Sequence, residues 1–267
     1  MMAREMRRIL IPLAIVAAIA LAAIILPVFL PWSHDAIDWD HARAAPGEAG
    51  HILGTDELGR DRLARLAAGT RITLLVALAA ALVSLLVGTA WGAVAGWIGG
   101  RGDEAMMRVV DALYALPFMF IVIVLMVVFG RSILLVFVGI GLVEWLTMAR
   151  IVRGQVLALR NRPFVLAALA SGAPAHTIIR QHILPNIAGV ALAYLTLTLP
   201  ALIMIESFLS FLGLGVQEPL TSLGILVKEG ADDMDIDALG LLLPGGVMVT
   251  LLVCLTLAGE RLRDRFA

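Results

Sequence analysis

Long apolar runs constrain this chain more than any other feature of its sequence. A helix rises about 1.5 Å per residue, so roughly 20 apolar residues are needed to cross the ~30 Å hydrocarbon core of a bilayer. The alternation over about ten residues that is typical of barrel strands is not seen. Runs of sufficient length occur six times, at residues 9–31, 72–99, 109–130, 132–149, 187–214 and 238–258. The sequence therefore predicts an all-α, polytopic membrane protein with six transmembrane helices.

The composition excludes several classes of protein. Hydrophobic residues make up 61% of the chain and charged residues 15%, with a mean hydropathy of +0.97, which is more apolar surface than a water-soluble domain can bury. Twenty Lys and Arg residues balance 21 Asp and Glu residues, which excludes a nucleic-acid binder held by bulk positive charge. The single cysteine, Cys254, lies in an apolar run, so no disulfide framework or cysteine-rich metal site is expected.

The first apolar run follows a basic N-terminus. Arg4, Arg7 and Arg8 precede it, as basic residues do in a secretory signal peptide. The apolar core of a signal peptide has about 7–15 residues, however, and this run is longer. We expect a retained first transmembrane helix, with a cleaved signal as the alternative.

The distribution of charge predicts the orientation of the helices. Short cytoplasmic loops collect Lys and Arg. With the N-terminus inside, most basic residues fall on the cytoplasmic side, and acidic residues gather in the first and last outside loops. Both termini are therefore expected in the cytoplasm. We expect a cytoplasmic N-terminus and first helix over 1–31, an outside loop over 32–71, and a five-helix core over 72–267 with a cytoplasmic loop at 150–186.

Glycines recur at every fourth position of the second run. Gly88, Gly92, Gly96 and Gly100 would form a stripe without side chains along one helix face, which another backbone can approach closely. We predict tight helix packing there. The alternative is that glycine is simply common in membrane helices.

Prolines lie inside three of the predicted spans. Pro117, Pro200 and Pro244 each remove a backbone hydrogen bond and can kink a helix. Kinked helices suit a protein that opens and closes, although they are also widespread in static membrane proteins.

Acidic side chains lie within or beside the spans at Asp111, Glu144 and Glu206, and such groups are candidates for function because they are costly in a membrane. Asp111 follows Arg108 by one helical turn, so we expect a structural ion pair between them. Glu144 is too far from Arg150 in sequence for a pair on one helix face. Glu206 has no cation near it in sequence and is the best candidate for lining a pathway or bracing a gate.

The segment between the fourth and fifth runs, residues 150–186, is too long for a simple turn and too polar to cross lipid. It contains short amphipathic pieces separated by Gly172 and Pro174. This pattern predicts two short helices at the membrane surface that face a soluble partner. A plain interfacial helix is the alternative.

The same segment resembles the EAA loop of ABC-transporter permeases, on residues 164–172 and 178–186. Leu166 stands where the family usually has a glutamate, so a salt bridge made by that glutamate is not expected here. The residues that match the family pattern are Ala167, Ala168, Gly172, Ile183, Leu184 and Pro185.

Further segments are similar to one branch of that family, the importers of dipeptides, oligopeptides or nickel. The chain looks like the second permease of the heterodimer, which carries an extra N-terminal span and a Gly-Thr-Asp motif in its first outside loop. The matching segments keep the family order and cover residues 51–61, 107–117, 149–155 and 206–216.

The resemblance implies a machine with several parts in and around a bacterial inner membrane. It implies a second permease subunit that shares the pathway, two cytoplasmic ATPase subunits, one of which docks on this EAA loop, and a periplasmic or extracellular solute-binding protein. ATP and magnesium would be bound by the ATPases, and this chain would bind no cofactor. The transported solute is not indicated.

The sequence lacks the chemistry for catalysis. A phosphate-binding loop needs Gly-Lys followed by Ser or Thr, and the only lysine, Lys228, follows a valine. No nucleophile elbow and no His-Glu-x-x-His motif occur, which argues against an intramembrane enzyme. The spacing of His34, His41 and His51 matches no standard metal site, so surface histidines are expected. The acidic stretch 233–237 lacks the glycine and glutamate of a calcium loop and is expected to be solvated, with a binding protein as a candidate contact.

A second class of function stays open. Asp111, Glu144 and Glu206 would form a relay in an ion-coupled secondary transporter. Such transporters often contain inverted repeats, and none is found in this sequence.

Overall fold

The computed structural model describes residues 2–129 and 133–266. The described part is helical, and its only strand-like feature is an isolated bridge between Thr55 and Asp61. Two short 3-10 turns, Trp39–His41 and Glu48–Gly50, lie in the first long loop. The α-helices are α1 Met2–Phe29, α2 Arg62–Ile98, α3 Gly100–Tyr114, α4 Phe118–Phe129, α5 Ile133–Leu159, α6 Pro163–Ala170, α7 Ala175–Ile178, α8 Leu184–Phe211, α9 Leu223–Asp232 and α10 Ala238–Phe266.

Within the described residues, four helical stretches are long and apolar enough to cross a membrane. The all-α, membrane-spanning prediction is confirmed at this level. Each stretch corresponds to one predicted run, namely the first, second, fifth and sixth. Their bounds are Arg7–Phe29, Arg62–Ile98, Ala175–Phe211 and Ala238–Arg265.

The third run, 109–130, was expected to form one continuous helix, and the structure corrects this expectation. Helix α3 ends at Tyr114 and α4 begins at Phe118. Pro117 lies between them, where it cannot donate a backbone hydrogen bond and restricts the residue before it. Residues 130–132, which hold the end of the third run and the start of the fourth, lie outside the described residues.

Several helices extend beyond the apolar runs. Helix α2 begins at Arg62 because the Asp61 carboxylate caps it, accepting a hydrogen bond from the Ala64 amide at 2.7 Å. Helix α5 continues past Ala149 to Leu159, so the connecting segment begins later than the predicted residue 150. Hydropathy marks only the part of a helix that is apolar, whereas capping and helix propensity set where the helix ends.

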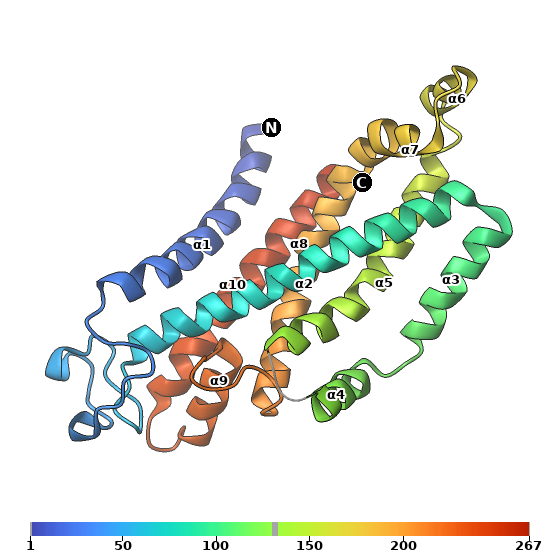
Figure 1. Cartoon of the computed structure of the whole chain (residues 1–267). Coiled ribbons are helices and arrows are strands. Elements are labelled where there is room, and N and C mark those ends of the chain that lie inside the picture. Colours follow the sequence, from blue (N-terminus) through green and yellow to red (C-terminus); the bar gives the residue numbers. More distant parts are fainter. Residues whose placement is uncertain (1, 130–132, 267) are drawn as a thin grey trace.

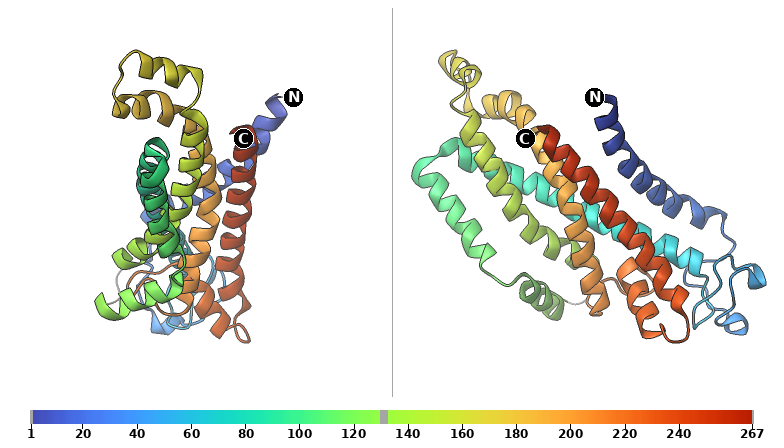
Figure 2. Two further views of the ribbon diagram at one scale, coloured as in Figure 1. Left: turned by 90° about the vertical axis from the view of Figure 1, so that its right-hand side faces the viewer. Right: turned by 180° about the vertical axis from the view of Figure 1, so that it is seen from behind.

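The helices run roughly lengthwise, with their connections gathered at two ends. Helix α2 crosses the molecule beside α5, α8 and α10, and α1 lies at the side (Figure 1). The N-terminus, the C-terminus, α6 and α7 lie at one end, whereas the first long loop, α9 and α4 lie at the other (Figure 2). We call these the terminal end and the loop end.

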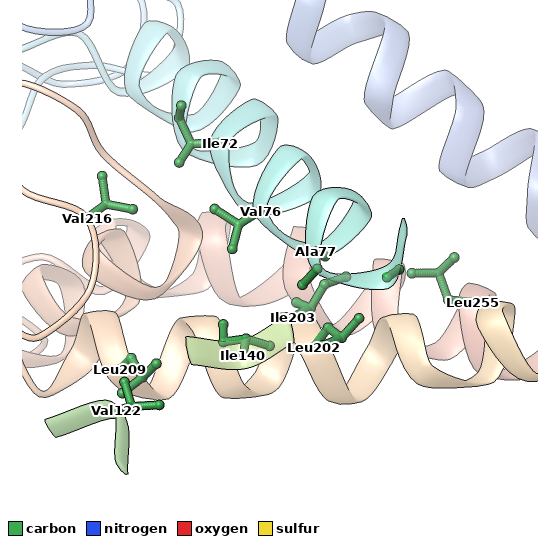
Figure 3. Close-up of a cluster of buried hydrophobic side chains, with 12 residues drawn as sticks. Ile72, Val76, Ala77, Val122, Ile140, Leu202, Ile203, Leu209, Val216 and Leu255 are labelled. Carbon is green, nitrogen blue, oxygen red and sulfur yellow. The ribbon is translucent and has the colours of Figure 1, made fainter. Parts of the chain in front are cut away.

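A cluster of buried apolar side chains joins α2, α8 and α10. Val76 of α2, Leu202 and Ile203 of α8, and Leu255 of α10 belong to this cluster, with the two α8 residues between Val76 and Leu255 (Figure 3). Alanines occupy the neighbouring buried positions of α2 and allow the helix axes to approach.

Three of the four striped glycines face α5. A Cβ atom added at Gly88 would lie 2.7 Å from the carbonyl oxygen of Trp145, and one at Gly96 would lie 2.8 Å from the Cβ of Val156. Gly92 lies directly against the backbone of α5. Real Cβ atoms do not approach other atoms this closely, so these three positions require glycine.

Gly100 does not belong to this stripe, contrary to the prediction. Gly99 has a φ of +67° and ends α2, so the chain turns before Gly100 begins α3. A Cβ at Gly100 would meet open space. The four-residue spacing alone did not indicate the end of the helix.

Candidate functional site

The segment that resembles the EAA loop folds as two helical pieces joined by a tight turn. Gly172 has a φ of +78°, a conformation that glycine adopts without strain. The amide of Ala173 donates to the carbonyl of Ala168 at 3.1 Å, and the amide of Gly172 donates to the carbonyl of Leu169 at 3.0 Å. These bonds close the C-terminus of α6 and direct the chain into α7.

One side of this segment is anchored on the transmembrane helices. Val165, Ile178 and Ile183 are fully buried and belong to a cluster with Val152 and Val156 of α5. Packed side chains fix the position of the loop relative to α5. A displacement of the loop would therefore move α5 with it.

Helix α6 also exposes large apolar side chains, on more than one of its faces. The exposed fractions are 50% for Leu166, 45% for Leu169 and 40% for Phe164. Ala167 is exposed beside them, and Ala168 is half-buried. Leu166 and Leu169 are three residues apart and therefore share a face of α6, and adjoining exposed apolar side chains are typical of a surface that another molecule covers.

The second half of the segment runs into α8 without a break. Residues Ile179–Ile183 form a π-turn, and Leu184 and Pro185 start α8. Pro185 has no amide hydrogen to donate to the preceding turn. The Asn186 side chain donates to the carbonyl of His182 at 2.6 Å. The sequence did not predict the π-turn. The proline was the only signal for it.

Glu206 lies in a buried polar cluster. Its side chain is fully buried and accepts hydrogen bonds from Thr73 at 2.9 Å and from Ser210 at 2.7 Å. Thr73 also accepts from the amide of Leu223, the first residue of α9, at 3.0 Å. Glu206 thus connects α8 to α2 and α9.

Asp111 is paired, but with a different residue from the one predicted. It accepts a hydrogen bond from Arg150 at 2.9 Å, and the Arg150 guanidinium also lies 4.4 Å from the centre of the Tyr114 ring. The prediction that Arg108 is the partner was wrong, because α5 brings Arg150 beside α3. Glu144 lies on α5 and is half-buried.

A second ion pair joins α3 and α5 at the terminal end. Arg153 donates twice to Asp103, at 2.5 and 2.7 Å, and Asp103 is only 4% exposed. Sequence reasoning missed this pair because the two residues belong to different helices. A bidentate Arg–carboxylate pair fixes both distance and orientation.

The loop end carries a larger charged cluster. Asp56 accepts from Arg60 at 2.7 Å and from Arg65 at 2.5 Å. Arg65 donates twice to Glu229 of α9, at 2.6 and 3.0 Å. The first long loop is therefore tied to α2 and α9 by charge-assisted hydrogen bonds.

The acidic stretch 233–237 was expected to be solvated; its middle residues are exposed, and its two end carboxylates are half-buried and paired with arginines. Asp233 accepts from Arg43 at 2.7 Å, and Asp237 accepts from Arg62. Both arginines belong to the first long loop or to the start of α2. The paired residues lie far apart in the sequence, so their pairing could not be predicted from it.

His51 is also not a surface histidine. It is 1% exposed, stacks on Trp32 with ring centroids 4.4 Å apart, and lies 2.8 Å from an oxygen of Asp61. In the described residues, no group of three or more His, Cys, Asp or Glu side chains is arranged to hold a metal ion.

Comparison with protein families identifies a match over most of the chain. Residues 88–266 match the family described as the binding-protein-dependent transport system inner membrane component. The matched region includes α3 to α10, and therefore both the exposed face of α6 and Glu206.

Two similar proteins are oligopeptide transport system permease proteins named OppC. The protein from Haemophilus influenzae is 46% identical over 94% of this chain and 81% of its own length. The protein from Escherichia coli K12 is 47% identical over 94% of this chain and 84% of its own length.

A solved structure with the same fold is the MetNI methionine ABC transporter in an inward-facing conformation. The matched chain superposes with a TM-score of 0.60 at 20% identity, covering 76% of this chain and 96% of that one. At this identity the likeness concerns the fold of the helices.

Proposed function

This chain belongs to the binding-protein-dependent transport system inner membrane component family, and from that premise we propose that it is one of two permease subunits of an ABC importer for oligopeptides. The observation that carries the proposal is the α6–α7 segment, anchored on α5 and exposing Leu166 and Leu169 on its free side. Identity of 46–47% to two OppC proteins supports the oligopeptide as substrate.

The proposed orientation places the terminal end in the cytoplasm. The N-terminus, the C-terminus and the α6–α7 segment share that end (Figure 2), which is consistent with basic residues on the cytoplasmic side. The proposal retains six spans, with α5 and the α3–α4 pair supplying those beyond the four long apolar helices. The domain organisation is a first helix, an outside loop near 32–71, and a core over 72–267.

The α6–α7 segment would receive mechanical work from outside the chain. In the proposed complex, two ATPase subunits bind ATP and magnesium, and one docks on the exposed face of α6. Because Val165 and Ile178 pack against α5, movement of the docked subunit would tilt α5 as a rigid body. A second permease and a solute-binding protein complete the assembly, and the outer pathway opens beside the Glu206 cluster.

An assembled transporter in liposomes tests the role of Gly172. Gly172→Val forces a β-branched residue into a left-handed conformation and should uncouple ATP hydrolysis from oligopeptide uptake. Gly172→Asn is the matched control, because asparagine tolerates that conformation, and it should retain coupling. Co-purification of the subunits shows whether assembly is intact. Uptake by Gly172→Val at the wild-type rate would refute the coupling role.

The ion-relay alternative receives no support from the positions of its residues. Asp111 is paired with Arg150, Glu206 is enclosed by hydroxyl groups, and no hydrogen bond in the described residues joins any two of the three acids. Uptake by this chain alone, driven by a proton gradient without ATP, would favour the alternative.

A further inference from the structure

A pocket lies where the loop end of α1 meets the beginning of α2. One part of its wall is apolar and is formed by Pro27 of α1, by Leu30 and Pro31 just after it, and by Ala64 and Ala68 of α2. The other part carries hydrogen-bond donors. The donor-bearing residues that line it are Trp32, Ser33, His34 and Arg71.

Two of these donors have no acceptor among the described residues. The indole nitrogen of Trp32 is buried and has no hydrogen-bond partner. The Arg71 guanidinium makes no hydrogen bond or ion pair with any residue that the structure describes. Ser33 and His34, in contrast, both face the carboxylate of Asp35. A buried donor without an acceptor is costly, and a guanidinium near hydrocarbon is more so.

The position of the pocket indicates which acceptor is available. The apolar run 9–31 ends immediately before Trp32, and the apolar run 72–99 begins immediately after Arg71. Both boundaries therefore meet at this pocket, at the depth where hydrocarbon gives way to headgroups. Tryptophan and arginine are typical of that depth, where lipid phosphates are the most abundant anions.

We propose that this pocket binds the phosphodiester of a phospholipid. Arg71 pairs with the phosphate, and the Trp32 indole N–H donates to one of its oxygens. The acyl chains lie along the exposed apolar faces of α1 and α2, where Ile24, Val28 and Leu75 are at least half exposed. The inference goes beyond the transport function, and it requires membrane insertion without depending on the solute.

Native mass spectrometry of the assembled transporter tests this site, with palmitoyl-oleoyl phosphatidylglycerol as the probe. Arg71→Gln should weaken retention of one lipid by about tenfold, the effect of losing one charge-assisted hydrogen bond. Trp32→Phe keeps an aromatic ring against His51 but removes the N–H, and should weaken retention by about threefold. Arg108→Gln and Trp39→Phe, at exposed positions elsewhere, are the matched controls and should leave retention unchanged.

Two further probes separate the possible sources of the anion. Diacylglycerol, which lacks the phosphate, should not bind in a manner that depends on Arg71. If inorganic phosphate binds with dependence on Arg71 and the phospholipid does not, the lipid assignment is overturned. Equal lipid retention by Arg71→Gln and Arg108→Gln, with equal melting temperatures, would overturn the site itself.

Discussion

The backbone carbonyl of Ala149 in α5 occupies the space into which a side chain at Gly92 of α2 would project. The amide nitrogen of Arg153 lies 3.0 Å from the same point, so backbone atoms surround it. Backbone in the middle of a helix cannot move aside as the end of a flexible side chain can. The close approach of α2 and α5 therefore requires glycine at position 92, as it does at Gly88 and Gly96.

We expect Gly92→Ala to separate α2 from α5 and to lower stability by about 1–3 kcal/mol, the usual range for an overpacked core. Gly154→Ala is the matched control, because Gly154 lies in α5 with nothing within 4 Å of its Cβ position. The control should be neutral or stabilising, since alanine favours helix. Thermal unfolding of the full chain in detergent measures both changes. Equal melting temperatures for the two variants would contradict the packing role.

The Glu206 cluster predicts different outcomes for two substitutions. Glu206→Gln keeps an acceptor oxygen for one of the two hydroxyls, Thr73 or Ser210, and can donate its amide N–H to the oxygen of the other, so it should preserve both the fold and ATP-driven uptake. Glu206→Leu leaves buried hydroxyl groups without an acceptor and should cost about 1–3 kcal/mol. Melting temperature and uptake in liposomes distinguish these cases. Abolished uptake by a well-folded Glu206→Gln protein would instead support a role in proton transfer.

The two ion pairs between α3 and α5 should contribute unequally to the free energy of unfolding. Arg153→Ala leaves Asp103 buried without its cation, and we expect a loss of about 2–3 kcal/mol, reduced from the full buried-pair penalty because Arg153 is about a third exposed. Arg150→Ala removes a pair in which both side chains are exposed, together with the stacking on Tyr114, and should cost less than about 1 kcal/mol. Denaturation midpoints compare the two. A larger loss of stability for Arg150→Ala than for Arg153→Ala would show that burial does not determine how much each ion pair stabilises the protein.

The pKa of His41 should respond to its neighbour Asp38. The hydrogen bond to Asp38 at 2.8 Å raises the pKa of His41 above its ordinary value of 6.5, and nearby negative charge adds to the effect. The protonated pair therefore favours the folded state fully below pH 6.5, and this contribution is lost as the pH rises through the raised value.

Asp38→Asn should return the His41 pKa toward 6.5, as followed by NMR of the histidine ring protons. Asp40→Asn is the control, because Asp40 acts on His41 through charge at a distance, without a hydrogen bond to the ring, and should shift the pKa less. An unchanged His41 pKa in Asp38→Asn would show that the hydrogen bond does not form in solution.

Local features of the sequence predicted much of the fold. Apolar length identified the long helices, and the order of motifs identified the α6–α7 segment. Helix boundaries were less predictable, because Asp61 extends α2 through its cap and Gly99 ends it. Pro117 indicated a kink in one helix, but the sequence alone did not indicate that the helix would be divided into α3 and α4.

The polar contacts were the least predictable part. Arg153 and Asp103, or Arg65 and Glu229, lie far apart in the sequence, and nothing in either segment indicates its partner. For Asp111, the cation one turn away was the natural partner in sequence, whereas the tertiary fold supplied another. The apolar run around Glu206 marks that residue as unusual, but one of its hydroxyl partners, Thr73, comes from α2, far away in the sequence.

The uncovered side of α6 also bears on how the protein is made. Leu166 and Leu169 project from a short helix at the edge of the molecule, where water would surround them in a lone subunit. Exposed apolar patches of this kind favour self-association. In the proposed importer, copies of this chain made in excess of its partners would therefore tend to associate with one another through these two leucines.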